Sequence, residues 1–454
     1  MAAGFRYTRP MDAPDLSLPD PDAAELIAAR PLLARHALDG LLAEGTPLAA
    51  IAAAVGTPVW VYGAHTLRSR TRRLAAALST AGLAAQVHFA VKANDRLAIL
   101  RLLAAEGAGA DVVSGGELAR AAAAGIPPGR TVFSGVGKTP AELRAALAAG
   151  IAQINLESAE ELDLLAAAAA ATGCRARVAL RVNPDIDAGT HAKISTGRAR
   201  DKFGIAYGDA VSLYARAAAT PGVEPVGLAV HIGSQIGSLA PFRAAYARLA
   251  ALVRDLRAAG QSVRVVDCGG GLAIGYRNEP VPGPEGWAGA LAGAFGGLEV
   301  TVMVEPGRWL VGPAGLLLST VTLVKQAGAQ RFVVLDAGMN DLVRPALYDA
   351  WHGIVPVAAA DLVAATGPAD VVGPVCESGD TFARDRALPK LAPGALVAIL
   401  DAGAYGAVMS SAYNARPPAA EVLVGLGNAP FQLIRRRPSP EALWRDECVP
   451  DLPS

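Results

Sequence analysis

A lysine at the end of a short apolar segment is the side chain in this sequence best suited to covalent chemistry. Lys92 follows residues that predict a β-strand over Val87–Val91, and apolar residues recur at helical spacing from Leu97 to Leu103. In α/β proteins, the end of such a strand lies at the ligand-binding edge of a parallel sheet or barrel. Partial burial there lowers the pKa of a lysine and exposes an amine suited to a Schiff base. A solvated lysine at a strand end is the simpler alternative.

Other predicted strands also end in residues that could bind a ligand. Three of these ends are His231-Ile232-Gly233-Ser234, Gly269-Gly270-Gly271 and Glu305-Pro306-Gly307-Arg308. The triple glycine allows backbone N–H groups to approach a phosphate, although a tight turn has the same pattern. Ser234 could add a hydroxyl, and Arg308 could bind phosphate or a substrate carboxylate in fork geometry.

A lysine together with a phosphate site suggests pyridoxal phosphate as the cofactor. The cofactor needs a partner for its pyridine nitrogen, and Glu305 is the candidate because a carboxylate favours the protonated ring. His231 could stack on the face of the ring. The simpler interpretation of His231 is a packed, hydrogen-bonded core histidine.

The order of the predicted elements indicates a fold that brings these strand ends together. Apolar segments alternate with amphipathic helices, which is typical of parallel strands joined by right-handed crossovers. The predicted strands are residues 87–91, 110–113, 131–133, 153–156, 177–182, 227–231, 263–267 and 299–304. Eight such units over roughly 220 residues predict a (β/α)8 TIM barrel. An open doubly wound sheet is the alternative, but it rarely needs eight consecutive units.

The rest of the chain predicts a second domain of different character. Beyond the barrel, β segments are joined by Gly- and Pro-rich loops, which predicts a mostly antiparallel β domain. We expect an N-terminal extension at 1–38, loosely docked through about residue 35, and a strand segment at 39–64 that joins the β domain. The barrel is expected over 65–309 and the β domain over 310–454.

Composition narrows the classes of function. Lys plus Arg and Asp plus Glu both number 41, so nothing favours a nucleic acid or an anionic membrane as partner. No apolar run reaches membrane-spanning length, and the N-terminal sequence lacks the pattern of a secretory signal. Four separated cysteines show no metal-type pairing, as expected for reduced thiols. We therefore expect a soluble, cytoplasmic protein without a metal site.

The motifs together resemble those of the diaminopimelate decarboxylases, pyridoxal-phosphate enzymes that pair an alanine-racemase-like barrel with a β domain. The resemblance extends from about Asp39 to Val424 and includes Asp111-Val112-Val113-Ser114-Gly115-Gly116-Glu117-Leu118 beside the strand ends above. Those motifs are shared with ornithine and arginine decarboxylases. Three β-domain motifs complete the resemblance, and the first two are closer to the diaminopimelate branch: Gly338-Met339-Asn340-Asp341-Leu342 with Arg344, Cys376-Glu377-Ser378-Gly379-Asp380, and Asp401-Ala402-Gly403-Ala404-Tyr405.

The resemblance implies a role for each candidate residue. Lys92 would hold pyridoxal phosphate covalently, Glu305 would bind its pyridine nitrogen, and His231 would stack on the ring. The remaining cofactor-binding residues would be Ser234, Gly269, Gly270, Gly271, Pro306, Gly307, Arg308 and Tyr405. The substrate's carboxylate and amine groups would be held by Arg308, Arg344, Tyr348, Glu377 and Tyr405. Cys376 would be the proton donor and would reach the barrel of a second subunit, which implies a homodimer with shared active sites.

The implied reaction is decarboxylation of meso-2,6-diaminopimelate to L-lysine and carbon dioxide, the last step of lysine biosynthesis. The alternative on the same fold is a decarboxylase of another basic amino acid or of a carboxylated polyamine. Its distal pocket would need an acidic group, so Arg344 argues against it. A racemase would place an arginine opposite the pyridine nitrogen, where Glu305 does the reverse, and a non-catalytic cofactor carrier would be a single barrel.

Overall fold

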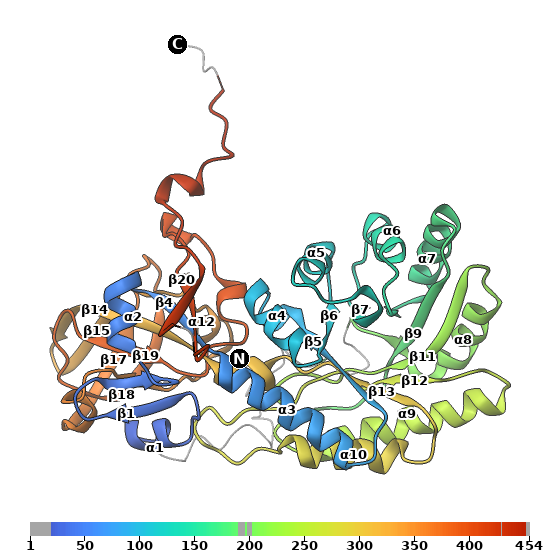
Figure 1. Ribbon diagram of the computed structural model, residues 1–454, viewed down its shortest axis with the longest axis horizontal. Helices are drawn as coiled ribbons and strands as arrows, with labels where there is room; N and C mark the ends of the chain where they lie inside the picture. Colours follow the sequence, from blue (N-terminus) through green and yellow to red (C-terminus); the bar gives the residue numbers. More distant parts are fainter. Residues whose placement is uncertain (1–19, 189–195, 198–201, 428, 451–454) are drawn as a thin grey trace, which may run out of the picture. The chain divides into compact units, whose positions relative to one another are not determined.

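The structure, a computed structural model, describes residues 20–188, 196–197, 202–427 and 429–450. It divides into two compact units (Figure 1). The first contains Arg68–Gly275 and Pro280–Leu310, and the second contains Pro21–Leu67, Tyr276–Glu279 and the chain from Val311 onward. The second unit is therefore assembled from stretches that are far apart in the sequence.

Parallel strands close a barrel in the first unit. Among the described residues, eight strands pair in the ring order β5-β6-β7-β8-β9-β11-β12-β13, and β13 pairs with β5. The ring consists of β5 (Ala85–Ala90), β6 (Gly109–Val112), β7 (Thr131–Phe133), β8 (Gln153–Leu156), β9 (Ala176–Asn183), β11 (Val223–Ala229), β12 (Val265–Asp267) and β13 (Thr301–Val304). A short strand, β10 (Ile205–Ala206), also pairs in parallel with β9. The predicted (β/α)8 barrel is confirmed.

Helices lie outside the ring of strands (Figure 1). They are α3 (Ala64–Thr80), α4 (Leu97–Ala105), α5 (Gly115–Ala123), α6 (Pro140–Ala149), α7 (Ala159–Thr172), α8 (Ala210–Ala219), α9 (Ala240–Ala258), α10 (Pro284–Phe295) and α11 (Arg308–Val311). Side-chain caps fix where several of them begin. Thr139 and Glu142 form a reciprocal capping box at α6, and Ser158 accepts the Glu161 N–H at α7. These caps therefore also mark where the loops after the carboxyl ends of β7 and β8 end.

The barrel core combines apolar and polar side chains. Val132, Val226, Val265 and Met303 form a buried apolar cluster. Three buried polar side chains lie within the last two residues of β6, β8 and β12, namely Asp111, Asn155 and Asp267. Burial of such groups is costly unless they find partners. The carboxyl end of the barrel is thus the part of the core where buried polar side chains replace apolar packing.

A mostly antiparallel sheet forms the second unit, as predicted. It contains β4 (Val59–Gly63), β14 (Gly315–Ala327), β15 (Gln330–Leu335), β16 (Ile354–Pro356), β17 (Thr366–Val372), β18 (Thr381–Pro389), β19 (Leu396–Ile399), β20 (Ala420–Val424) and β21 (Phe431–Arg435). The long strand β14 pairs antiparallel with β4, β15 and β19. Only β15–β17 and β4–β20 are parallel pairs among the described strands of this sheet.

The segment before β4 packs into the same unit. Leu26, Ile27 and Leu41 belong to its buried core. A capping box between Asp22 and Glu25 starts the first helix, so local capping and apolar burial both order this stretch. The segment comprises α1 (Ala23–Ala28), β1 (Leu33–His36), β2 (Gly40–Ala43), β3 (Thr46–Pro47) and α2 (Leu48–Val55). This corrects the expectation of loose docking through about residue 35; residues 1–19 of the expected extension lie outside the described residues.

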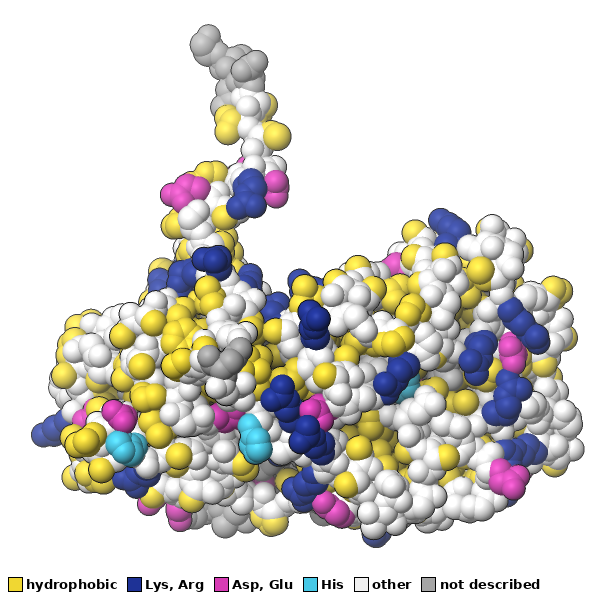
Figure 2. Space-filling view, in the orientation of Figure 1, with side chains coloured by type: hydrophobic (Ala, Val, Ile, Leu, Met, Phe, Trp, Pro, Cys, Tyr) yellow, Lys and Arg dark blue, Asp and Glu magenta, His cyan; other side chains and the backbone are white. Residues whose placement is uncertain are grey.

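Surface side chains carry both signs of charge. On the face shown in Figure 2, Lys and Arg side chains lie interspersed with Asp and Glu among apolar groups. In the described part of the chain, no helix combines the length and apolar character needed to cross a membrane. The mixed surface charge agrees with the balanced composition and indicates no additional class of partner.

Candidate active site

Lys92 lies at the carboxyl end of β5, in a single 3-10 turn formed by Val91–Ala93. Its Nζ donates a hydrogen bond of 3.1 Å to Oδ2 of Asp111, which comes from the neighbouring strand β6. Asp111 is completely buried, and its Oδ1 has no hydrogen-bond partner among the described residues. The carboxylate therefore holds the amine at the mouth of the barrel while one buried oxygen remains available to another donor.

His231 follows β11 and presents a neutral imidazole. The Gly270 N–H donates to its Nδ1 at 3.1 Å, which places the ring proton on Nε2. Burial lowers the pKa of His231 well below 6.5, and the positive charges of Arg181 and Lys92 lower it further. An uncharged, flat ring at this position is suited to stacking against another ring.

The triple glycine after β12 allows three strand ends to approach one another closely. A Cβ at Gly269 would lie 2.6 Å from the Val230 carbonyl oxygen, and one at Gly270 would lie 2.2 Å from the Glu305 carbonyl oxygen. Gly269 also has a φ of +62°, a conformation that favours glycine. The Gly269 N–H donates to Asp267 Oδ1 at 3.0 Å. The first two amides of the motif thus bond within the protein, which differs from the expectation that the glycine amides face an anion.

Glu305 follows β13 and is buried within the mouth of the barrel. Ser134 Oγ donates to its Oε1 at 3.2 Å. Burial raises the pKa of Glu305 well above 4.5, and the negative charges of Asp111 and Asp267 raise it further. Glu305 therefore keeps its proton to higher pH than an ordinary glutamate, and it can share that proton with a basic nitrogen.

Arg308 and Ser234 lie together on the loops after β13 and β11. Arg308 is buried at the start of α11, and its Nη2 donates to Ser234 Oγ at 3.1 Å. A guanidinium beside a hydroxyl is a suitable pair of groups for a phosphate or a carboxylate. The two side chains thus form a polar pair at the mouth of the barrel, beside the triple glycine in the same unit.

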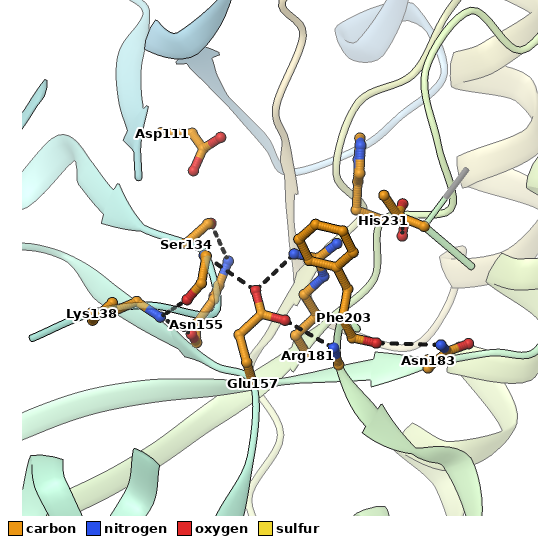
Figure 3. Close-up of polar contacts among 12 residues, drawn as sticks. Asp111, Ser134, Lys138, Asn155, Glu157, Arg181, Asn183, Phe203 and His231 are labelled. Carbon is orange, nitrogen blue, oxygen red and sulfur yellow. Dashed lines mark hydrogen bonds and ion pairs between the residues drawn. The ribbon is translucent and has the colours of Figure 1, made fainter. Parts of the chain in front are cut away.

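A buried ion pair between Glu157 and Arg181, for which the sequence suggested no role, anchors the loop before β10 (Figure 3). Glu157 accepts hydrogen bonds from Arg181 Nη1 at 2.7 Å and from the Gly204 N–H at 2.9 Å. The Arg181 guanidinium lies 4.8 Å from the centroid of the Phe203 ring. The pair joins the end of β8 to β9 and places the positive charge of Arg181 where, after burial, it lowers the pKa of His231 further.

A second unassigned network supports Glu305 from within the barrel. Asn155 Nδ2 donates to Ser134 Oγ at 3.1 Å and to Asp267 Oδ2 at 2.9 Å; Figure 3 labels Asn155 and Ser134. Ser134 in turn donates to Glu305. In the sequence, Asp267 is the one polar residue of Val265–Asp267, whereas Asn155 shares its strand with Gln153, so the pattern alone gave only a weak signal for this network.

Arg344 is the prominent charged residue of the second unit's candidate set. It is buried at the start of α12 (Arg344–Tyr348), and its guanidinium lies 5.4 Å from the centroid of the Tyr276 ring. Tyr276 also packs edge-on against His352, with ring centroids 5.3 Å apart. Tyr348 ends the same short helix and is half-buried. The guanidinium thus packs against an aromatic face.

Cys376 and Glu377 lie on an exposed loop of the second unit. The Cys376 N–H donates to Asn414 Oδ1 at 2.8 Å. Asp380 closes the loop by accepting the N–H groups of Met339 and Val375, each at 2.6 Å. The thiol is therefore carried by an anchored loop that faces outward.

The predicted site residues fall into two sets. The barrel unit brings together the ends of β5, β11, β12 and β13, with Lys92, His231, Ser234, Gly269–Gly271, Glu305, Pro306, Gly307 and Arg308. The second unit carries Arg344, Tyr348, Cys376, Glu377 and Tyr405. Among the described residues, no group of three or more His, Cys, Asp or Glu side chains could hold a metal ion.

Residues 65–312 match the family described as the pyridoxal binding domain of pyridoxal-dependent decarboxylases, which is more than half of the chain. A diaminopimelate decarboxylase of Zymomonas mobilis is 51% identical over 411 residues, covering 90% of this chain and 96% of that protein. One of Pseudomonas aeruginosa is 47% identical over 409 residues, covering 90% and 97%. The chain belongs to the diaminopimelate decarboxylases. The resemblance stated from the motifs is confirmed.

Solved structures of diaminopimelate decarboxylases agree with this assignment. The Helicobacter pylori enzyme complexed with L-lysine has a TM-score of 0.82 at 41% identity, covering 86% of this chain and 96% of that chain. The M. jannaschii enzyme in co-complex with L-lysine has a TM-score of 0.88 at 35% identity, covering 93% and 98%. Matches that cover this much of the chain include both the barrel unit and the second unit.

As a diaminopimelate decarboxylase, the protein uses pyridoxal phosphate, and the strand ends fit that cofactor. Lys92 has an amine that would hold the cofactor, Arg308 with Ser234 is a polar pair that would suit its phosphate, and Glu305 is a buried carboxyl that would suit its pyridine nitrogen. His231 has a neutral ring that would suit stacking. The buried Asp111 Oδ1 beside Lys92 is a further acceptor at the same place. The residues present thus match the needs of the cofactor group by group.

Proposed function

We propose that this protein decarboxylates meso-2,6-diaminopimelate to L-lysine and carbon dioxide, the last step of lysine biosynthesis. The observation that carries the proposal is a second buried arginine. Arg308 lies beside Ser234 in the barrel unit, and Arg344 lies against Tyr276 in the second unit. Diaminopimelate keeps a distal carboxylate that a basic amino acid lacks, so Arg344 suits it while Arg308 and Ser234 remain available for the cofactor phosphate.

The barrel residues would hold and tune the cofactor. When bound, pyridoxal phosphate supplies the electron sink that accepts the bonding electrons of the departing carboxylate. Lys92 would hold the cofactor covalently, and Glu305 would keep a proton on the side of the ring nitrogen. His231, neutral and fixed by the Gly270 amide, would stack on the ring without drawing off its charge. Ser234 and Arg308, with Gly269–Gly271, Pro306 and Gly307 beside them, would bind the phosphate.

Residues of the second unit would bind the substrate and return a proton. Arg344 would bind the distal carboxylate, and Tyr348, Glu377 and Tyr405 would contact the remaining polar groups of the substrate. Cys376 would donate a proton from Sγ to the carbon that has lost its carboxylate. Arg344 would thus pair with a fixed charge of the substrate, and the Cys376 thiol would supply the proton that the reacting carbon gains.

We further propose a homodimer with shared active sites, located in the cytoplasm. Cys376 and Glu377 are exposed on the single chain, but a proton donor for a carbanion must be shielded from water. A second copy of the chain would provide that shielding by covering the Cys376 loop with its own barrel. The free cysteines of the described chain suit a reducing compartment.

Product analysis tests the reaction. Purified protein with pyridoxal phosphate and meso-diaminopimelate should release L-lysine and carbon dioxide in equal amounts. Conversion of lysine, ornithine or a carboxylated polyamine instead would favour the alternative decarboxylase, and racemised substrate would favour neither.

Substitution of Arg344 tests the distal carboxylate. Arg344→Ala should lower kcat/KM for meso-diaminopimelate by roughly tenfold to a hundredfold per lost bond, because charge-assisted hydrogen bonds contribute about 1.5–3 kcal/mol each. Cofactor binding should not change. Arg384→Ala is the matched control, since its side chain is 70% exposed in the same unit. Wild-type kinetics in Arg344→Ala would remove the support for a dicarboxylate substrate.

Mixing inactive chains tests the shared site. Lys92→Ala and Cys376→Ala chains are each expected to be inactive as homodimers. After random exchange of equal amounts, hybrid dimers should restore up to about a quarter of all sites, because each hybrid has one site with both residues intact. If exchange is demonstrated and activity does not return, the two residues act within one subunit.

A further inference from the structure

Arg30, just after α1, is a buried arginine that has no role in the proposed chemistry. It is 5% exposed, and its guanidinium bonds to separate stretches of the second unit. Nε and Nη2 donate to Asp401 Oδ2 at 2.7 and 2.5 Å, and Nη2 also donates to the Tyr276 carbonyl at 2.8 Å. Nη1 donates to the Leu26 carbonyl at 2.7 Å and to Asn278 Oδ1 at 3.0 Å.

This set of bonds requires an arginine. All three nitrogens of the fork are used, in directions that a planar guanidinium provides and a single ammonium does not. A buried charge is costly unless it is paired and fully bonded, so the arrangement holds its partners in one geometry. Arg30 thereby ties residues 26–30, 276–278 and 401 together at one point.

Two of the partners lead directly to proposed substrate-binding residues. The ring of Tyr276 faces the Arg344 guanidinium at 5.4 Å. Asp401 begins the turn that ends at Tyr405, and these two residues have φ values of 53° and 56°. Such left-handed conformations are uncommon for residues other than glycine and persist where the surroundings impose them. The Arg30–Asp401 pair is a buried contact at the first residue of this turn.

We propose that Arg30 is a positioning residue for Arg344 and Tyr405, acting through Tyr276 and Asp401. The inference rests on the proposed function, since it takes Arg344 and Tyr405 as substrate-binding residues. It gives the N-terminal segment a role in substrate affinity, in addition to its place in the core. The bond from Arg30 to the Tyr276 carbonyl also fixes the chain five residues after Gly271, the last residue of the triple glycine.

The test compares Arg30→Met with Arg35→Met in the holoenzyme. Arg35 is an exposed arginine of the same segment, which bonds the Leu362 carbonyl at 3.5 Å, so its loss controls for the removal of a charge. Arg30→Met should raise KM for meso-diaminopimelate at least tenfold while kcat and cofactor affinity change less than threefold. Amide hydrogen exchange should become faster in peptides covering residues 276–279 and 401–405. Arg30→Lys should show a smaller change in the same direction, and Arg35→Met should show neither.

Each outcome decides for or against the inference. Faster exchange in both stretches with unchanged KM would show a purely structural role and overturn the inference, as would unchanged exchange. If Arg30→Met does not fold, Arg30→Lys and Asp401→Asn take its place with the same two measurements and the same criteria. Failure of the proposed function is distinguishable: the wild-type protein would then not convert meso-diaminopimelate, and KM for its true substrate would replace that measurement.

Discussion

Substitution of Gly270 by alanine should disable the site although no charged or acidic group is removed. The added Cβ would lie 2.2 Å from the Glu305 carbonyl oxygen, whereas ordinary contacts begin at 3.4 Å. The two backbones must therefore separate by about 1.2 Å, the difference of these distances. A misplacement of about 1 Å can cost on the order of a hundredfold in rate, and overpacking costs about 1–3 kcal/mol of stability. We expect kcat/KM of Gly270→Ala to fall roughly a hundredfold.

The assay is steady-state decarboxylation of meso-diaminopimelate, together with cofactor titration by absorbance and thermal unfolding. Gly137→Ala is the matched control, because its Cβ would meet nothing within 4 Å. Loss of activity in Gly270→Ala should exceed what reduced folding explains, and cofactor affinity should fall with it. If Gly270→Ala kept kcat/KM and cofactor affinity within twofold of wild type, the close approach of the glycines to Glu305 would not position the site.

The remaining predictions concern two carboxyl groups. Burial, followed by Asp111, raises the pKa of Glu117 to about 7 from 4.5, so the folded protein binds this proton more tightly than the unfolded chain does. The resulting stability is present below pH 4.5 and is lost as pH rises to about 7, which amounts to roughly 3 kcal/mol. Glu117→Gln should flatten that dependence in urea unfolding between pH 5 and 8, while its amide oxygen still accepts the Val113 N–H; an unchanged slope would contradict the pKa assignment. Glu305→Gln should still allow borohydride to fix the cofactor to Lys92, as peptide mapping would show. It should nevertheless lower kcat by more than about tenfold, because a neutral amide does not stabilise a proton on the ring nitrogen as a carboxylate does. Normal turnover would mean that Glu305 does not face that nitrogen.

The barrel could be predicted because its strands are short apolar runs separated by amphipathic helices. β18 was not predicted, since Arg384, Asp385 and Arg386 interrupt its apolar pattern. α1 and β1 were missed because the Pro-, Asp- and Ala-rich composition of residues 1–31 is also typical of loosely docked segments, whereas β2 and β3 fall within the strand segment expected at 39–64. Their order comes from burial against strands more than 250 residues later in the chain, which no local pattern reveals.

Candidate residues at strand ends were accessible to sequence reasoning because parallel strands present their carboxyl ends on one face. Asp111, Asp267 and Arg181 were given no role, since a polar residue in a barrel strand does not show by itself which partner it meets. Their partners are set by the closure of the ring, as when β8 and β9 bring Glu157 to Arg181. The hydrogen bonds of Gly269 and Gly270 also depend on residues that the motif does not include, so the glycine motif alone did not reveal that these two amides donate to Asp267 and His231.

The place of β4 in its sheet imposes an order of events during synthesis. Within β4, residues 59–62 pair with residues 315–318 of β14 on one side, and residues 59–63 pair with Ala420–Val424 on the other. About 250 residues must be translated before the first partner exists, a delay on the order of 10–50 s at roughly 5–20 residues per second. The barrel is encoded within that interval, so it can fold on the ribosome while β4 still exposes two unpaired edges. A nascent chain arrested before residue 420 would carry a finished barrel beside an incomplete sheet, and that exposed strand is where chaperones or aggregation should act first.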